Sequence, residues 1–417
     1  MAEKAFHDTS RAAIELREQL ASDKRRLAFF MGAGTSMAVG IPGIEALTQQ
    51  VKESLKEAQG TYFDHICKEI GDNPNVEDVL NRVRLYRELL GDDESKTHKS
   101  LTGKAAKELD TAICGTIHQN VSIEPPKGIL PHKTFAQWLY ASYSGRGWPI
   151  EIFTTNYDLL LEKAMEEVGV PYFDGFVGSV TPFFAPESVE ADDTKTYEGV
   201  CPPRAWTRLW KMHGSVNWYL REAGQSGKKH VTRLSDIASP AGEELMIFPS
   251  REKYVESRKL PFLSYQDRLR RFLSNGEAVL FIIGYSFSDE HLNEIIFQGL
   301  RGNSRLAVNV LMYGVEKERE GKNTLVLPEA VVEYGKAYRN MSVYGPDKAV
   351  IGGIVREWAP PPKMKEDNVY WSDDEHRFTL GDFTALASYL ERFIGIGSPS
   401  AFQVSAEVET EETENED

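Results

Sequence analysis

The 417-residue chain has few cysteines, and none of them sits in a metal-binding or disulfide arrangement. No two form a CxxC pair, which argues against a disulfide framework and a zinc ribbon and is typical of a reducing compartment. No set of histidines, cysteines and carboxylates has metal-ligand spacing, so we expect no bound metal. The three cysteines are Cys67, Cys114 and Cys201.

Long apolar runs, a signal peptide and a surplus of cations are also missing. Runs such as 278–283 are far too short to span a bilayer, and the N-terminal sequence has no apolar signal segment, so we expect a soluble cytoplasmic protein that binds no membrane. The formal charge is −15, from 48 Lys and Arg against 63 Asp and Glu. This balance disfavours direct binding of nucleic acid. No GxxxxGK[ST] motif occurs, which argues against P-loop ATP hydrolysis.

Acidic residues are concentrated near the C-terminus. Segment 405–417 (SAEVETEETENED) holds seven carboxylates and no cation. Such a segment cannot bury enough apolar surface to fold, so we expect residues 396–417 to form a disordered acidic tail. Both a solubilising tail and an electrostatic docking strap are consistent with this composition.

The sequence does contain a repeated alternation of buried strands and amphipathic helices. Residues 26–31 (RLAFFM) predict a buried strand that runs directly into a glycine turn and a helix. This pattern predicts an α/β fold, a Rossmann-like doubly wound parallel sheet. The further strands are expected at 149–154, 209–213, 278–283 and 308–312, the last sheet edge at 342–345, and a closing helix around 383–393.

Two stretches depart from the alternation. Residues 60–145 carry apolar side chains at helical spacing and no convincing strand, which predicts a helical insertion between the first two strands of the sheet. Residues 172–205 are rich in aromatic residues, proline and glycine, and we expect a long ordered loop over a pocket. The predicted domains are therefore an α/β domain of residues 1–59 and 146–395, the insertion, and the tail.

Small or polar clusters follow four of the predicted strands. In an open α/β sheet, ligands bind outside the carboxyl ends of the strands, so we expect these clusters to converge in space. The four are GAGTS (32–36), TTNYD (154–158), MHGS (212–215) and GYSFSD (284–289).

The glycines of residues 32–36 allow close backbone approach to a diphosphate near a helix N-terminus. A tight turn packed with small residues explains them equally well. The motif is not the dehydrogenase GxGxxG, because Met37 stands where its third glycine would be. Similarly, Asp158 suits a helix cap as well as a ligand contact, whereas Asn156 is harder to explain as a cap.

A lone histidine such as His213 is more often structural than catalytic. At the convergence of strand ends, however, a neutral imidazole near a ribose can take a proton from a hydroxyl or from water. In the last cluster, we expect Ser288 and Asp289 to cap the following helix, and Gly284 and Ser286 to meet a ligand.

Taken in this order, the motifs resemble those of the sirtuin family. Residues 32–36 are similar to its GAGxS loop, 40–42 (GIP) to the start of its GIPDFR segment, and 155–158 (TNYD) to its TQNID motif. His213 with Gly214 resembles its HG pair, and 284–286 its GxS. The resemblance implies that NAD+ binds at the strand ends as a substrate.

By this resemblance, Asn156 contacts the nicotinamide ribose and positions a nucleophile, and His213 is the general base. The GAGTS loop holds the diphosphate, and Gly284 with Ser286 lies on the adenosine side. The implied NAD+-binding residues are Gly32, Ala33, Gly34, Thr35, Ser36, Ile41, Pro42, Thr155, Asp158, Gly284 and Ser286.

Two departures narrow the resemblance. The four-cysteine zinc ribbon of deacylating sirtuins is absent, and residues 43–45 (GIE) replace their Asp-Phe-Arg. The signature instead resembles the sirtuin-like NAD+ hydrolases of bacterial antiphage defence, and most of all the stand-alone sirtuin-like subunit of two-gene systems. This resemblance implies a HerA-type hexameric ATPase and DNA translocase as partner, and a large ring-like homo-oligomer.

The predicted activity is cleavage of NAD+ to nicotinamide and ADP-ribose, which depletes NAD+ and aborts the infection. NAD+-dependent protein deacylation is one alternative, and an assembly scaffold that binds NAD+ or ADP-ribose is another. Nuclease action lacks a carboxylate–metal constellation in the sequence.

Overall fold

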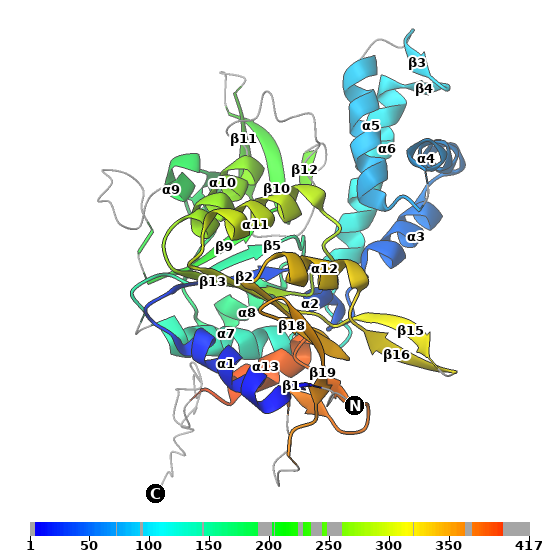
Figure 1. Ribbon diagram of the computed structural model, residues 1–417. Coiled ribbons are helices and arrows are strands. Elements are labelled where there is room, and N and C mark those ends of the chain that lie inside the picture. The colour runs from blue at the N-terminus through cyan, green and yellow to red at the C-terminus, as the bar shows by residue number, and fades with distance from the viewer. Residues whose placement is uncertain are drawn as a thin grey trace, which may run out of the picture.

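The computed structural model of the chain is built around one large sheet (Figure 1). It describes residues 5–71, 73–91, 95–143, 146–190, 202–203, 205–223, 228–234, 244–247, 261–319, 321–362 and 369–394.

Seven neighbouring parallel strands make up most of a ten-stranded sheet and reach one of its edges. The chain enters the middle at β2, adds strands on one side, and then crosses β2 to add strands on the other. This is the doubly wound order, with its switch point between β2 and β13, and it confirms the predicted fold class. In sheet order, the seven are β17 (Met341–Tyr344), β14 (Leu306–Leu311), β13 (Ala278–Ile283), β2 (Arg26–Met31), β5 (Glu151–Thr154), β9 (Thr207–Lys211) and β6 (Tyr172–Phe173).

Helices cover both faces of the sheet, which explains the continuous apolar strands. In β2, Ala28 and Phe30 point into one core, whereas Phe29 and Met31 point into the other. The first core is covered by α10 (Pro261–Ser274), α11 (Glu290–Gly302) and α12 (Glu329–Ala337), and the second by α1 (Thr9–Ala21), α7 (Leu130–Tyr143), α8 (Leu160–Val168) and α13 (Phe383–Glu391).

The sheet does not end at residues 342–345, so that prediction is wrong. Beyond β17 lie β18 (Lys348–Ile351), β19 (Ile354–Ala359) and β1 (His7–Asp8). Gly352 and Gly353 connect β18 to β19 with φ values of +60° and +82°. A two-residue turn with two positive φ angles matches the twist of a hairpin, and this glycine pair is the signal in the sequence for the extra strands.

A second sheet was not expected. Five antiparallel strands pack beside the large sheet, and part of the predicted loop 172–205 supplies two of them. Residues 191–201 and 204 lie outside the described residues. In sheet order, the strands are β12 (Glu244–Ile247), β10 (Gly214–Ala223), β11 (Lys228–Arg233), β8 (Phe183–Phe184) and β7 (Phe176–Val177). The short helix α9 (Pro186–Glu190) follows β8 in the chain. Two further hairpins are β15 (Val315–Arg319) with β16 (Lys322–Val326), and β20 (Trp371–Ser372) with β21 (Arg377–Phe378).

The helices between β2 and β5 divide into two groups. One group shares a core of its own and projects from the sheet (Figure 1); we call it the helical arm. It comprises α3 (Ile44–Ser54), α4 (Glu57–Ile70), α5 (Val76–Leu90), α6 (Gly103–Val121) and the hairpin of β3 (Thr97–His98) and β4 (Leu101–Thr102). By contrast, α7 packs against α8 and α13 below the sheet. The arm therefore begins with α3, and the domain boundaries stay a prediction.

Over its described residues, the chain has no helix that is both long and apolar enough to cross a bilayer. The predicted acidic tail, residues 396–417, lies outside the described residues.

Candidate active site

The backbone of the GAGTS loop packs directly on the loop after β13. The Gly32 amide donates to the Ile283 carbonyl over 2.9 Å, and the Gly34 amide to the Gly284 carbonyl over 2.9 Å. A Cβ on Gly34 would lie 2.6 Å from Gly284 Cα, and one on Gly284 would lie 2.6 Å from the Thr35 amide nitrogen. The backbones of the two loops are thus in direct contact at the switch point between β2 and β13. Glycine is required there by packing alone, whether or not the loop also binds a ligand.

We expect Gly34→Ala to lower the free energy of unfolding by about 1–3 kcal/mol, because its methyl group meets backbone that cannot yield. Gly115→Ala is the matched control: Gly115 lies in α6, and a Cβ there would meet nothing within 4 Å. That change should be neutral or stabilising by about 0.5–1 kcal/mol. Urea denaturation checks both variants, and equal stabilities would contradict the packing argument.

Asn156 follows β5 and is tied to the GAGTS loop. Its Nδ2 lies 2.9 Å from Thr35 Oγ1, 2.8 Å from Ser36 Oγ and 3.2 Å from the Gly32 carbonyl oxygen. These contacts fix the amide plane, so the orientation of Oδ1 is fixed as well. Among the described residues, none donates a hydrogen bond to Oδ1.

Asp158 joins the start of α8 to the GAGTS loop, and its predicted contact with a ligand stays a prediction. Its Oδ1 accepts from the Leu160 amide at the start of α8 over 3.0 Å, and its Oδ2 accepts from Ser36 Oγ over 2.6 Å. Asp158 and Ser36 are both buried. The carboxylate therefore accepts from the first amide of α8, whose N-cap residue is Leu159, and holds the GAGTS loop. Ser36 links it to Asn156.

His213 lies in the turn between β9 and β10, and its Nε2 is 3.0 Å from Asp289 Oδ2. His213 is buried, with 7% of the residue exposed. Asp289, not Ser288, is the N-cap of α11: its Oδ1 accepts from the amides of His291 and Leu292 at 2.9 and 3.1 Å. The prediction that Ser288 caps this helix is therefore wrong, and Ser288 Oγ instead lies 2.8 Å from Ser286 Oγ.

Electrostatics favours an ionised Asp289 beside the imidazole. The pKa of Asp289 is lowered overall. Burial alone would raise this pKa, but the hydrogen bond and the charge of His213, together with the two amides at the start of α11, lower it by more. An anionic carboxylate accepts hydrogen bonds only, so the proton of a neutral His213 is on Nε2. Nδ1 is then the nitrogen that can take up a proton.

On the Nδ1 side lies a residue that no motif in the sequence indicates. Glu77, in the first turn of α5 in the helical arm, has its Oε1 3.9 Å from Nδ1 of His213. The Tyr157 hydroxyl donates to the same carboxylate, and the Tyr157 and His213 rings are 6.4 Å apart. Burial raises the pKa of Glu77, although His213 and the Tyr157 hydrogen bond oppose the shift.

Lys211, the lysine of the Lys-x-His-Gly-Ser sequence, lies under these loops. Its side chain is 2% exposed, and Nζ lies 2.8 Å from Glu162 Oε1 and 2.8 Å from Ser215 Oγ. The same ammonium donates to the carbonyls of Tyr157 and Asp158. Lys211 therefore joins the backbone of the TTNYD loop to the turn that carries His213.

The other predicted residues divide into exposed and buried groups. Ala33 and Ser286 are exposed at the carboxyl edge of the sheet, and Thr155 is half-buried there. Ile41 is 4% exposed and belongs to the core of the helical arm, and Pro42 beside it is half-buried. Whether any of them contacts NAD+ stays a prediction.

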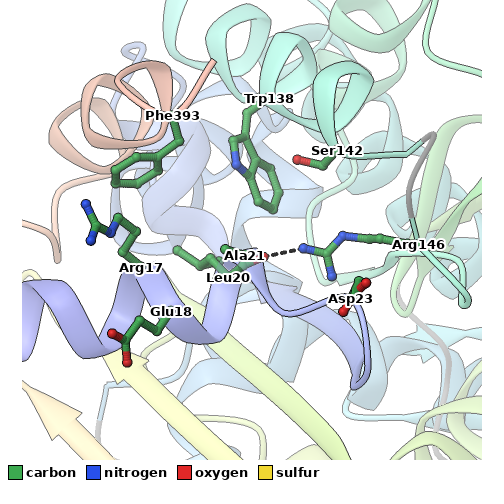
Figure 2. Close-up of a pocket in the computed structure, with 9 residues that line it drawn as sticks. All are labelled: Arg17, Glu18, Leu20, Ala21, Asp23, Trp138, Ser142, Arg146 and Phe393. Carbon is green, nitrogen blue, oxygen red and sulfur yellow. Dashed lines mark hydrogen bonds between the residues drawn. The ribbon is translucent and has the colours of Figure 1, made fainter. Parts of the chain in front are cut away.

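A cavity of about 690 Å³ lies elsewhere (Figure 2). Trp138 of α7 and Phe393 form its apolar wall, and Arg17 and Arg146 lie at its sides. Arg146 donates to the carbonyls of Leu20 and Ser22 at the end of α1. None of the predicted site residues lines it. Within the described ranges, no group of three or more histidines, cysteines and carboxylates is arranged to hold a metal ion.

Residues 150–330 match the family model of the SIR2-like domain. This segment contains the TTNYD loop, the HGS turn (213–215) and the GYSFSD loop. No curated protein matches the chain. One similar solved structure is a complex of a Sir2 homologue with NAD, 14% identical over 74% of this chain and 84% of that chain, with a TM-score of 0.31. Another is a mutant Sir2 homologue with 2′-O-acetyl ADP ribose, 14% identical over 71% and 83%, with a TM-score of 0.29. Through residues 150–330, the match to the SIR2-like domain supports the sirtuin-like family that the sequence motifs resemble.

Proposed function

We propose that this chain hydrolyses NAD+ to nicotinamide and ADP-ribose at the carboxyl edge of the large sheet. The observation that carries the proposal is the hydrogen bond between His213 and Asp289, which leaves Nδ1 as a base close to the loop of Asn156. The match to the SIR2-like domain supports NAD+ as the substrate.

In the proposed reaction, the bond between ribose C1′ and the nicotinamide ring nitrogen breaks, and its electron pair neutralises the cationic ring. The oxygen of water bonds to C1′, and the proton passes to Nδ1 of His213 and then to solvent. Asn156, oriented through its Nδ2, offers Oδ1 to the water or to a ribose hydroxyl. Asp289 holds the tautomer and stabilises the imidazolium that forms.

From the resemblance of the motifs alone, we also propose a biological role and a partner for the chain. NAD+ depletion would serve antiphage defence, with a HerA-type hexameric ATPase and DNA translocase as the partner and a ring-like homo-oligomer as the assembly. A toxic hydrolase needs restraint, so we expect the chain to be more active with its partner than alone.

The test is NAD+ consumption and nicotinamide release by the purified chain, alone and with the HerA-type ATPase. We expect turnover, and we expect Asn156→Ala to reduce it by about tenfold or more, because the amide that orients the reactants is lost. NAD+ that binds without turnover in both settings would favour the scaffold. Consumption that needs an acyl-lysine peptide and yields O-acyl-ADP-ribose would favour deacylation.

A further inference from the structure

The base of the helical arm packs on three of the four loops that build the proposed site. Val39, just after the GAGTS loop, Tyr157 and Leu160 after β5, and Val216 after His213 belong to the same core as the arm. All four are 8% exposed or less. On the arm side, the first two turns of α5 contribute Val76, Val79 and Leu80, which are fully buried.

One polar group lies in this apolar contact. Glu77 is the second residue of α5, accepts a hydrogen bond from the Tyr157 hydroxyl, and has its Oε1 3.9 Å from Nδ1 of His213. The start of α5 is itself well fixed, because Asn75 caps it through the amides of Glu77 and Asp78. The carboxylate is therefore placed by the arm and not by the sheet.

We propose that Glu77 is a positioning residue for His213 supplied by the helical arm, so that the site is complete only while the arm is docked as seen here. This inference rests on the proposed function and adds a second carboxylate, on the Nδ1 side of the ring. The imidazolium formed during the reaction would then lie between Asp289 and Glu77. A partner that moves the arm would change the activity of a site that it does not touch.

The first test compares Glu77→Gln with the wild-type chain in NAD+ turnover. A carboxylate that faces a charge formed only in the transition state raises kcat more than it changes KM. We therefore expect kcat to fall by about tenfold with KM nearly unchanged. Glu88→Gln is the matched control, because Glu88 is an exposed glutamate on the same helix and should leave turnover unchanged.

The pH profile separates this role from mere support of the fold. The titratable groups that face Glu77 are His213, Tyr157, Asp289 and the neighbouring Asp78. Removing the carboxylate takes away a negative charge that faces the imidazole ring, so the pH profile of kcat should differ between Glu77→Gln and the wild-type chain. A kcat within about two-fold of wild type together with a superimposable profile would overturn the proposal.

Amide hydrogen exchange gives a readout that does not need turnover. In Glu77→Ala, the Tyr157 hydroxyl loses its acceptor, and we expect faster exchange both in residues 155–160 and at the start of α5. If the wild-type chain turns over no NAD+ either alone or with the ATPase, the hydrolase proposal fails while exchange still tests the contact. Unchanged exchange in both segments would mean that Glu77 does not hold the arm to the site.

Discussion

We expect Asp289→Asn to lower NAD+ turnover by about 100-fold or more, within the range of a lost acid–base group, and to leave α11 intact. In the wild-type chain, one carboxylate oxygen caps α11 and the other accepts from His213. Asparagine caps helices as well as aspartate does, so its side-chain oxygen stays on the α11 amides. The NH2 group must then face Nε2. It can only donate, so the imidazole proton shifts to Nδ1, and the ring can no longer take a proton there.

The matched control is Asp382→Asn. Asp382 caps α13, a helix of the second core, through the amides of Thr384 and Ala385. We expect wild-type turnover and nearly unchanged stability for it. His213→Ala sets the floor that Asp289→Asn should approach. If Asp289→Asn instead keeps wild-type kcat, then the Asp289–His213 hydrogen bond serves only to pack the loop, and the base must be sought elsewhere.

The central strands were predictable because both faces of the sheet are covered. Residues 278–283 are six consecutive buried apolar residues ended by Gly284, and the predicted strand matches β13 residue for residue. The strand β10 carries no such signal. Ser215 and Asn217 interrupt its apolar residues, and only the fold shows that both are buried at 0% and 8% exposure.

Part of the proposed site could be predicted from the positions of the strands. Asn156 and His213 stand at strand ends, and strand ends meet at one edge of a parallel sheet. For Asp289, the sequence predicted only the role of a helix cap, because its second carboxylate oxygen contacts a side chain 76 positions away in the chain. Glu77 had no signal at all, since its place depends on how the helical arm folds back onto the loops after β5 and β9.

Lys211→Met should lower the free energy of unfolding by about 3–5 kcal/mol, because breaking a buried ion pair leaves an uncompensated charge. Methionine keeps the length and much of the volume of lysine, so the packing around residue 211 changes little. The variant leaves the carboxylate of Glu162 and the carbonyls of Tyr157 and Asp158 without their shared donor. Because the same ammonium joins the TTNYD loop to the His213 turn, turnover should fall at temperatures where the variant is still folded.

The stability loss should also depend on pH. Burial raises the pKa of Glu162 in the folded chain, and Lys211 opposes that shift. Without the lysine, the folded state favours the protonated acid more strongly, so the variant loses stability as pH rises through the folded pKa of Glu162, and the deficit is smallest in acid. Urea denaturation at several pH values measures it. Lys336→Met, at an exposed pair with Glu333 on α12, should show no measurable change at any pH. A deficit independent of pH would mean that the lost carbonyl contacts, and not the buried carboxylate, account for the destabilisation.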